Sequence, residues 1–150
     1  MVIIADTSCL ITLERSDQLI ILNRVFGEIF ITPEIRNEFQ LPLPEWVKEI
    51  PVKNKEYQKL LERTLDKGES SAIALVQELE NALLVIDEVK GRKVAQKIGI
   101  KFTGTLGVLL EAKKLGHITS LQKMITKLKA NNFRISETVE AEVLRKANEL

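Results

Sequence analysis

The sequence predicts an α/β domain with a mostly parallel central sheet and helices on both faces. Short apolar runs alternate along the chain with segments of helical periodicity. One of these runs, Ala82–Ile86, is apolar throughout, which is typical of a parallel strand buried on both faces. No Pro/Gly/Ser linker or internal repeat divides the 150 residues, so we expect one domain over residues 1–150.

The strands are expected in short runs rich in β-branched and apolar residues. In chain order these are Val2–Ala5, Ile29–Ile31, Ala82–Ile86 and Ile100–Phe102. Residues 41–54 hold three of the four prolines, and proline interrupts regular structure, so we expect an irregular connection there.

The helices are expected where apolar residues recur every three or four positions. They are a helix starting near Cys9, Gln18–Phe26, a helix opened by Thr32 and Pro33, Lys55–Leu65, Gly68–Leu79, Val89–Ile98, Thr105–Leu115, Leu121–Leu128 and Ser136–Ala147. Pro33 suits the first position of its helix, and glycines follow three of the others.

The composition is that of a globular protein with a substantial core: 45% of the residues are hydrophobic and 29% are charged. One cysteine, Cys9, excludes an internal disulfide framework and suits a reducing cytosol, so we expect a cytoplasmic protein. No apolar run approaches the roughly 20 residues of a membrane span, and the first residues lack the basic start of a signal peptide. We therefore expect no membrane partner.

Two aspartates directly follow expected strands. Asp6 follows Val2–Ala5, and Asp87 follows Ala82–Ile86. Binding sites of parallel sheets form beyond the carboxyl ends of the strands, near the point where the strand order reverses. If the two strands are neighbours, both aspartates reach the same edge of the sheet. The alternative for each is a helix N-cap, a common role for Asp at a strand-to-helix turn.

Two glutamates are the other candidates for this edge. Glu69 follows Gly68 at the start of a helix, and Glu38 lies beside the apolar stripe of the helix opened by Pro33. Simpler explanations are a first-turn Glu favoured by the helix dipole and a solvated helix Glu. Crowded carboxylates raise one another's pKa unless a cation neutralises them, and Mg²⁺ or Mn²⁺ prefers such oxygen ligands.

Other chemistries find less support in the sequence. It contains no dinucleotide-binding glycine motif, no P-loop and no G-x-S-x-G motif. The only histidine, His117, follows Gly116 in an expected turn and is interpreted as a surface residue, while Cys9 is expected in the core. A zinc site would need a Cys/His cluster that the chain lacks.

The net charge of +1 hides a marked asymmetry. Between Lys90 and Arg134 eleven Lys/Arg stand against one acid, Glu111, so this segment carries +10 and the rest of the chain −9. The segment, called here the basic segment, is either a set of solvated lysine faces or a flank that holds a polyanion beside the acidic site.

Four motifs resemble the PIN-domain family. They are IIADTSCLI with Asp6, TPEIRNEF with Glu38, DKGESSAIAL with Glu69, and LLVIDEVKGRKVA with Asp87. Within the family, D-T-S, G-E-x-x-A-I, I-D-x-x-x-G-R and G-T-L-G-V-L resemble an uncharacterised prokaryotic branch, and the last motif stands here at Gly104–Leu109. The motifs arrive in family order and cover nearly the whole chain.

The resemblance implies a three-layer α/β/α PIN-like domain in which Asp6, Glu38, Glu69 and Asp87 are the catalytic, metal-binding acids. Thr7 or Ser8 would orient Asp6 or a bound water. Arg92 would reach a substrate phosphate. Independently of the resemblance, the charge bias of the basic segment predicts that it forms an RNA-facing rim, with Lys93 and Lys97 among the residues that bind RNA phosphates. Many toxin members carry Asp where this chain has Glu69, and a further Asp soon after the strand-end Asp, where this chain has Glu88.

The function expected from these features is an Mg²⁺- or Mn²⁺-dependent endoribonuclease, as in the toxins of VapBC-type toxin–antitoxin pairs. The expected partners are RNA, a small antitoxin protein and a second copy of the chain in a homodimer. One alternative is a catalytically degenerate PIN-fold module that binds RNA or protein. Another is a receiver-type regulator, which would need a second acid after the first strand, where this chain offers only Asp6 and Thr7.

Overall fold

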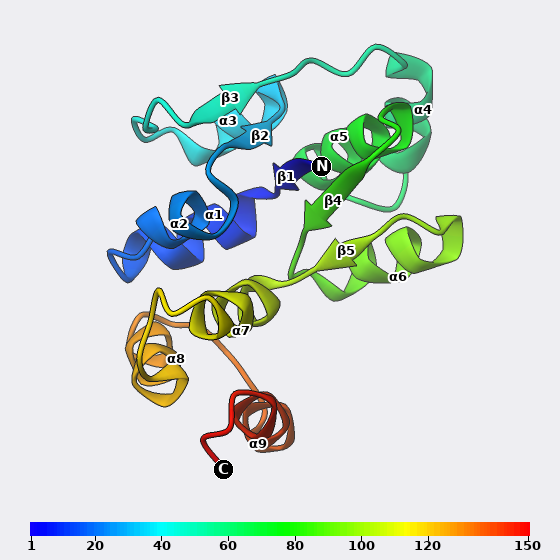
Figure 1. Cartoon of the computed structure of the whole chain (residues 1–150). Helices are drawn as coiled ribbons and strands as arrows, with labels where there is room; N and C mark the ends of the chain where they lie inside the picture. Colours follow the sequence, from blue (N-terminus) through cyan, green and yellow to red (C-terminus); the bar gives the residue numbers. More distant parts are fainter.

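The computed structural model describes residues 1–150, and a five-stranded, fully parallel sheet forms its centre (Figure 1). The strands are β1 (Val2–Ala5), β2 (Ile29–Ile31), β3 (Val47–Glu49), β4 (Ala82–Val85) and β5 (Phe102–Thr103). Their order in the sheet is β3-β2-β1-β4-β5. From β1 the chain adds β2 and β3 on one side of β1, and it then adds β4 and β5 on the opposite side. The strand order therefore reverses between β1 and β4. Ligands of parallel sheets generally bind at such a reversal, beyond the carboxyl ends of the strands, and this edge of β1 and β4 is called the crevice below.

The pairing of β1 with β4 sets the register at this crevice. The two strands pair over their whole length, from Val2 opposite Ala82 to Ala5 opposite Val85. The next residue, Asp6, still donates its backbone N–H to the carbonyl of Val85 at 2.9 Å. Asp6 and the residues that follow β4 therefore leave the sheet side by side.

The edge strand β3 corrects the expectation of an irregular connection at 41–54. Val47–Glu49 pairs in parallel with β2, and the carbonyl of Trp46 accepts a hydrogen bond from the N–H of Ile29 at 3.0 Å. The three prolines of this region, Pro42, Pro44 and Pro51, lie outside the strand. Proline is tolerated beside a short edge strand because it removes no hydrogen bond from the ladder. A strand of three residues, Val47–Glu49, is too short to show an alternating pattern, so the sequence does not predict it.

Nine helices complete the fold. They are α1 (Thr7–Arg15), α2 (Ile20–Phe26), α3 (Pro33–Phe39), α4 (Lys55–Leu61), α5 (Lys67–Glu78), α6 (Val89–Ile98), α7 (Thr105–Lys114), α8 (Leu121–Ala130) and α9 (Glu137–Lys146). α4, α5 and α6 cover one face of the sheet, and α1, α2 and α7 cover the other (Figure 1). This three-layer α/β/α arrangement is the predicted one. α3 contacts both α1 and α5, and α8 and α9 contact α7.

One continuous core runs through the layers. It contains 36 buried apolar residues, among them the fully buried Ile4 of β1, Leu84 of β4 and Ile73 of α5. Cys9 is also fully buried and makes no disulfide, as expected. No helix has both the length and the hydropathy to cross a membrane. β1 and β4, which precede Asp6 and Asp87, are anchored in this core, so the core fixes the backbone from which both aspartates leave the sheet.

Glu149 closes the start of α8 from the far end of the chain. Its carboxylate accepts hydrogen bonds from the N–H groups of Leu121 at 2.6 Å and Gln122 at 3.0 Å, and from Lys113 Nζ at 2.7 Å. Burial raises the pKa of Glu149, but these hydrogen bonds outweigh it and lower the pKa to about 2. A single carboxylate thus joins α7, α8 and the residues after α9.

We expect Glu149→Gln to lower the free energy of unfolding at neutral pH by about 1–2 kcal/mol, since hydrogen bonds to a charged acceptor become weaker neutral ones. The folded pKa of Glu149 is depressed, so its contribution is complete above the ordinary pKa of 4.5 and is lost as the pH falls toward 2. Urea unfolding across this pH range should therefore show the variant and the wild type converging in acid. Glu45→Gln, at an exposed acid without a hydrogen-bond partner, is the control. A constant difference between Glu149→Gln and wild type down to pH 2 contradicts the assignment.

Candidate metal centre

Asp6 stands at the carboxyl end of β1, in the N-cap position of α1, and α1 begins at Thr7 rather than near Cys9. Its side chain makes no capping hydrogen bond, so the helix-cap explanation does not account for it. Asp6 is 2% exposed, and its Oδ1 is buried without any hydrogen-bond partner. A buried carboxylate oxygen without a donor is costly, and a cation would satisfy it.

The electrostatics of Asp6 show which acids surround it. Burial is the largest cause that raises its pKa, to about 8. The backbone N–H of Thr7 opposes this shift, while the negative charges of Glu69, Asp66 and Glu38 add to it. Three further acids are therefore near enough to repel Asp6. Such a cluster favours either a proton or a divalent cation.

Glu69 is 5% exposed in the first turn of α5 and does two things at once. It forms a capping box with Asp66: its N–H donates to Asp66 Oδ1 at 2.8 Å, and its Oε1 accepts from the Asp66 N–H at 3.4 Å. Its other oxygen, Oε2, is buried without a partner. Burial, followed by the charge of Asp66, raises the pKa of Glu69 to about 7. The helix-start role expected for Glu69 is real, but it occupies only one of the two oxygens.

Glu38 is exposed on α3, yet its carboxylate is fixed. Thr7 Oγ1 donates to its Oε1 at 2.6 Å, and the Gly68 N–H donates to its Oε2 at 3.1 Å. These bonds tie α3 to the starts of α1 and α5, so Glu38 is more than a solvated helix residue. The hydroxyl of Thr7 was expected to orient Asp6 or a water, and the structure places it on Glu38 instead. Ser8 Oγ is buried without a partner.

Asp87 lies after β4 as predicted, half-buried at the same edge of the sheet. It does not cap α6, whose N-cap residue is Glu88. Instead Thr105 donates to it twice, from its N–H to Oδ1 at 2.8 Å and from its hydroxyl to Oδ2 at 2.6 Å. Asp87 thereby holds the start of α7. Each carboxylate oxygen keeps a further lone pair that can bind a cation.

The four predicted acids have different surroundings in the structure. Asp6, Glu38 and Glu69 share one electrostatic neighbourhood with Asp66, and Asp87 is held by Thr105. No group of three or more His, Cys, Asp or Glu side chains lies close enough to bind one metal ion as the side chains stand. Carboxylates would have to turn toward a cation before three of them could share it. The unpartnered oxygens of Asp6 and Glu69 are free to do so, and an all-oxygen donor set fits Mg²⁺ or Mn²⁺.

Glycines make room for the acids. A Cβ atom at Gly68 would overlap with Glu38 Oε1. At Gly91 it would lie 3.0 Å from Glu69 Oε2, and at Gly104 it would lie 2.7 Å from Asp87 Oδ1. Three of the acids therefore pack directly against glycine backbone, where any side chain would push a carboxylate away.

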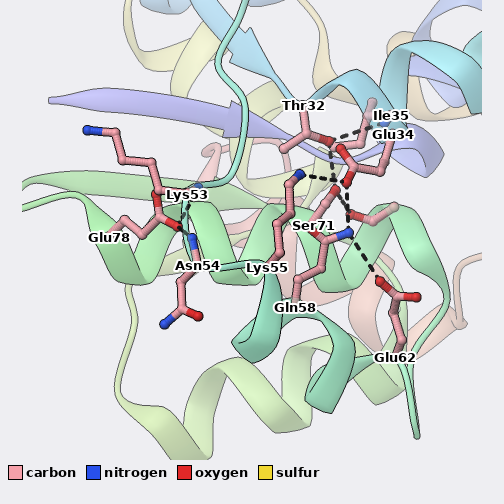
Figure 2. A network of polar contacts seen from close by, with 11 residues as sticks. Thr32, Glu34, Ile35, Lys53, Asn54, Lys55, Gln58, Glu62, Ser71 and Glu78 are labelled. Carbon is pink, nitrogen blue, oxygen red and sulfur yellow. Dashed lines mark hydrogen bonds and ion pairs between the residues drawn. The ribbon is translucent and has the colours of Figure 1, made fainter.

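A polar network outside the crevice fixes the helices that carry Glu38 and Glu69 (Figure 2). Thr32, the N-cap of α3, shares a 2.6 Å hydrogen bond with Ser71 of α5, whose hydroxyl also donates to the Gly68 carbonyl at 2.7 Å. Gln58 of α4 donates to Glu34 of α3 at 2.7 Å (Figure 2). The first turns of α3 and α5 are therefore held in a fixed relation by side chains that lie outside the acidic cluster.

Two residues of the site were not predicted. Asp66 belongs to the acidic cluster, and its D-x-x-E spacing to Glu69 is a sequence signal that could have identified it. Thr105 holds Asp87 across 18 positions of sequence, and no local pattern reveals this contact. His117 is half-buried in the turn after α7 and forms no hydrogen bond with the acids.

The basic segment supplies one cation beside the acids. The Arg92 guanidinium lies over the Phe102 ring, 5.3 Å from its centroid, and a Cβ atom at Gly104 would lie 3.0 Å from Arg92 Nη1. Lys93 and Lys97 are exposed on α6. Of the eleven basic residues only Lys113 and Lys129 form ion pairs. Most of the excess positive charge is therefore available to an external polyanion.

The comparisons with known proteins agree with these features. The family model described as "DUF3368: PIN domain" matches residues 2–149, which confirms the resemblance seen in the sequence. No curated protein and no solved structure matches the chain. PIN domains are generally nucleases, and they typically use divalent metal ions. With nearly its whole length matched and the family's three-layer fold present, the chain belongs to the PIN-domain family.

Proposed function

We propose that this protein is an endoribonuclease that uses Mg²⁺ or Mn²⁺ bound by Asp6, Glu38, Glu69 and Asp87. The observation that carries the proposal is the pair of buried carboxylate oxygens without partners, Asp6 Oδ1 and Glu69 Oε2, at the crevice of a nuclease-type fold. A divalent cation would satisfy both oxygens and relieve the repulsion within the cluster.

The chain's own residues would hold this centre in place. Thr7 and the Gly68 N–H orient Glu38, Asp66 orients Glu69, and Thr105 orients Asp87. A bound divalent cation supplies an activated water and neutralises charge on a phosphodiester, so no histidine base is required. The excess of unpaired cations on the basic segment, including Lys93 and Lys97, would attract the polyanionic substrate.

The proposed biological setting is that of a VapBC-type toxin. In that setting the chain would form a homodimer and would cleave RNA in the cytoplasm. A small antitoxin protein would bind the enzyme and neutralise it. The family and the sequence motifs support this setting. The free, fully buried Cys9 agrees with a reducing compartment.

A second candidate function is a catalytically degenerate PIN-fold module that binds RNA or protein. One observation favours it: no three acids stand within reach of a common metal ion. In such a module the hydrogen bonds of Glu38 and Asp87 would serve only to join helices.

The two candidates differ in their dependence on metal. We expect the wild type to cleave single-stranded RNA in Mn²⁺ or Mg²⁺, to stop in EDTA and to resume when Mn²⁺ is restored in excess, because the cluster needs the cation to bind phosphate. The products can be followed on denaturing gels, with DNA of the same sequence as the comparison. RNA that is bound but never cleaved, over a panel of structured and unstructured substrates, would assign the degenerate module.

A further inference from the structure

A groove opens beside Asp87, between the start of α7 and the helices α6 and α9. Its volume is about 240 Å³, and Asp87 stands at its wall next to Arg92 and Gly104. α9 contributes Val139, Glu142, Val143 and Lys146. The groove is therefore continuous with the proposed metal centre, although its far wall comes from the end of the chain.

The cations of the groove have no partners within the protein. Neither Arg92 nor Lys146 forms an ion pair, and both side chains are exposed. The packing of Arg92 against the Phe102 ring restricts the guanidinium without neutralising it. Two unpaired cations on opposite walls are suited to bind an anionic backbone that enters between them.

Beside the two cations and the acids Asp87 and Glu142, the lining has an apolar part that suits a planar ring. Leu106 and Leu110 of α7 and Val139 and Val143 of α9 form its apolar part. Val139 is 43% exposed, so the groove leaves a large hydrophobic side chain in water. Its volume lies below the roughly 300–1,000 Å³ of pockets for larger ligands, which limits the occupant to one nucleotide-sized group.

We propose that this groove binds one nucleotide of single-stranded RNA next to the cleaved phosphodiester. The base packs against Leu110 and Val143, and Arg92 and Lys146 hold the adjoining phosphates. The assignment rests on the proposed function, since it gives the groove its substrate. It adds that α9 forms part of the substrate site.

The first test uses the unaltered protein in EDTA, so that binding is measured without cleavage. Uridine and adenosine 5′-monophosphates are titrated against protein with labelled methyl groups. We expect shifts of the Leu106, Leu110, Val139 and Val143 methyl signals that saturate together. Saturating shifts confined to other residues, or no shifts at millimolar nucleotide, would overturn the assignment.

The second test compares two charge reversals of equal size. Lys146→Glu should weaken the binding of an oligouridine of roughly twelve nucleotides by about tenfold in EDTA and lower the salt slope by about 1, because a phosphate contact is lost. Lys48→Glu, at an exposed lysine of the edge strand β3 that lies outside both the groove and the basic segment, should change affinity less than about twofold. Circular dichroism checks that both variants are folded. Equal effects of the two reversals would overturn the assignment.

The two proposals can fail separately. If nucleotides bind the groove in EDTA but RNA is not cleaved in Mn²⁺, the proposed ribonuclease activity is wrong and the RNA-binding site at α9 stands. If RNA is cleaved in a metal-dependent way but the methyl signals of the groove do not shift, the ribonuclease activity stands and the groove is not the nucleotide site. A protein segment that shifts the groove methyls while the nucleotides do not would assign the groove to a protein partner and overturn the RNA assignment.

Discussion

Replacing Asp6 with Asn is expected to lower Mn²⁺-dependent RNA cleavage by more than about 100-fold while the fold survives. Asn keeps the size and hydrogen-bonding capacity of Asp but removes the charge that would bind the cation. If Asp6 were a helix cap, Asn would replace it well, since the two cap helices about equally. The absence of a capping hydrogen bond and the unpartnered Oδ1 favour the large effect. Initial cleavage rates in Mn²⁺ measure it.

The same variant should be more stable than the wild type when metal is absent. The folded pKa of Asp6 is raised to about 8 from 3.8, so the folded protein loses stability as the pH rises between these values and Asp6 ionises. Asn has no such ionisation, so the advantage of Asp6→Asn should reach at least about 1 kcal/mol near pH 8. Asp17→Asn, at an exposed left-handed position that Asn tolerates, should change neither activity nor stability. Full activity of Asp6→Asn would exclude Asp6 as a ligand.

Replacing Gly68 with Ala should lower cleavage by about tenfold or more with little change in stability. The added Cβ would overlap with Glu38 Oε1, so the carboxylate must move. Turning Glu38 toward solvent gives up its hydrogen bonds from Thr7 and the Gly68 N–H, whereas Ala favours the helix by up to about 1 kcal/mol over Gly, so the two effects on stability oppose each other. Gly68→Ala should therefore lose activity while its free energy of unfolding stays close to that of the wild type. Rates in Mn²⁺ together with urea unfolding measure both.

Ser70→Ala provides the matched control two positions further along α5. Ser70 is fully buried, and its Oγ has no hydrogen-bond partner, so removal of the hydroxyl should leave both rate and stability near the wild-type values. If Gly68→Ala were as active as Ser70→Ala, the position of Glu38 would not matter to the reaction.

Most of the sheet could be predicted from the sequence. Val2–Ala5 and Ile29–Ile31 are strands at the predicted bounds, because buried parallel strands need continuous apolar runs. β3 was missed because a three-residue edge strand has one buried side chain, Val47, and prolines on both sides. The predicted strand at Ile100–Phe102 is shifted to Phe102–Thr103, within the usual uncertainty of strand ends.

The candidate site was predictable only in part. The parallel topology places Asp6 and Asp87 at one edge, since both follow neighbouring strands. What each oxygen contacts depends on residues distant in sequence. Thr7 meets Glu38 across 31 positions, and Gly68 meets it across 30. The sequence could therefore indicate which acids follow neighbouring strands, whereas their hydrogen-bond partners required the fold.

The most direct test of a metal centre at Asp6 is the anomalous scattering of crystals grown with Mn²⁺. We expect a Mn²⁺ peak at the crevice between β1 and β4, with oxygens of Asp6 and Glu69 among its ligands and no such peak in Asp6→Asn crystals. Glu38 or Asp87 should turn toward the ion, because no three acidic side chains stand within reach of one metal ion in the structure. A wild-type crystal in excess Mn²⁺ with no ion at this crevice, or with Asp6 outside the coordination sphere, would contradict this expectation.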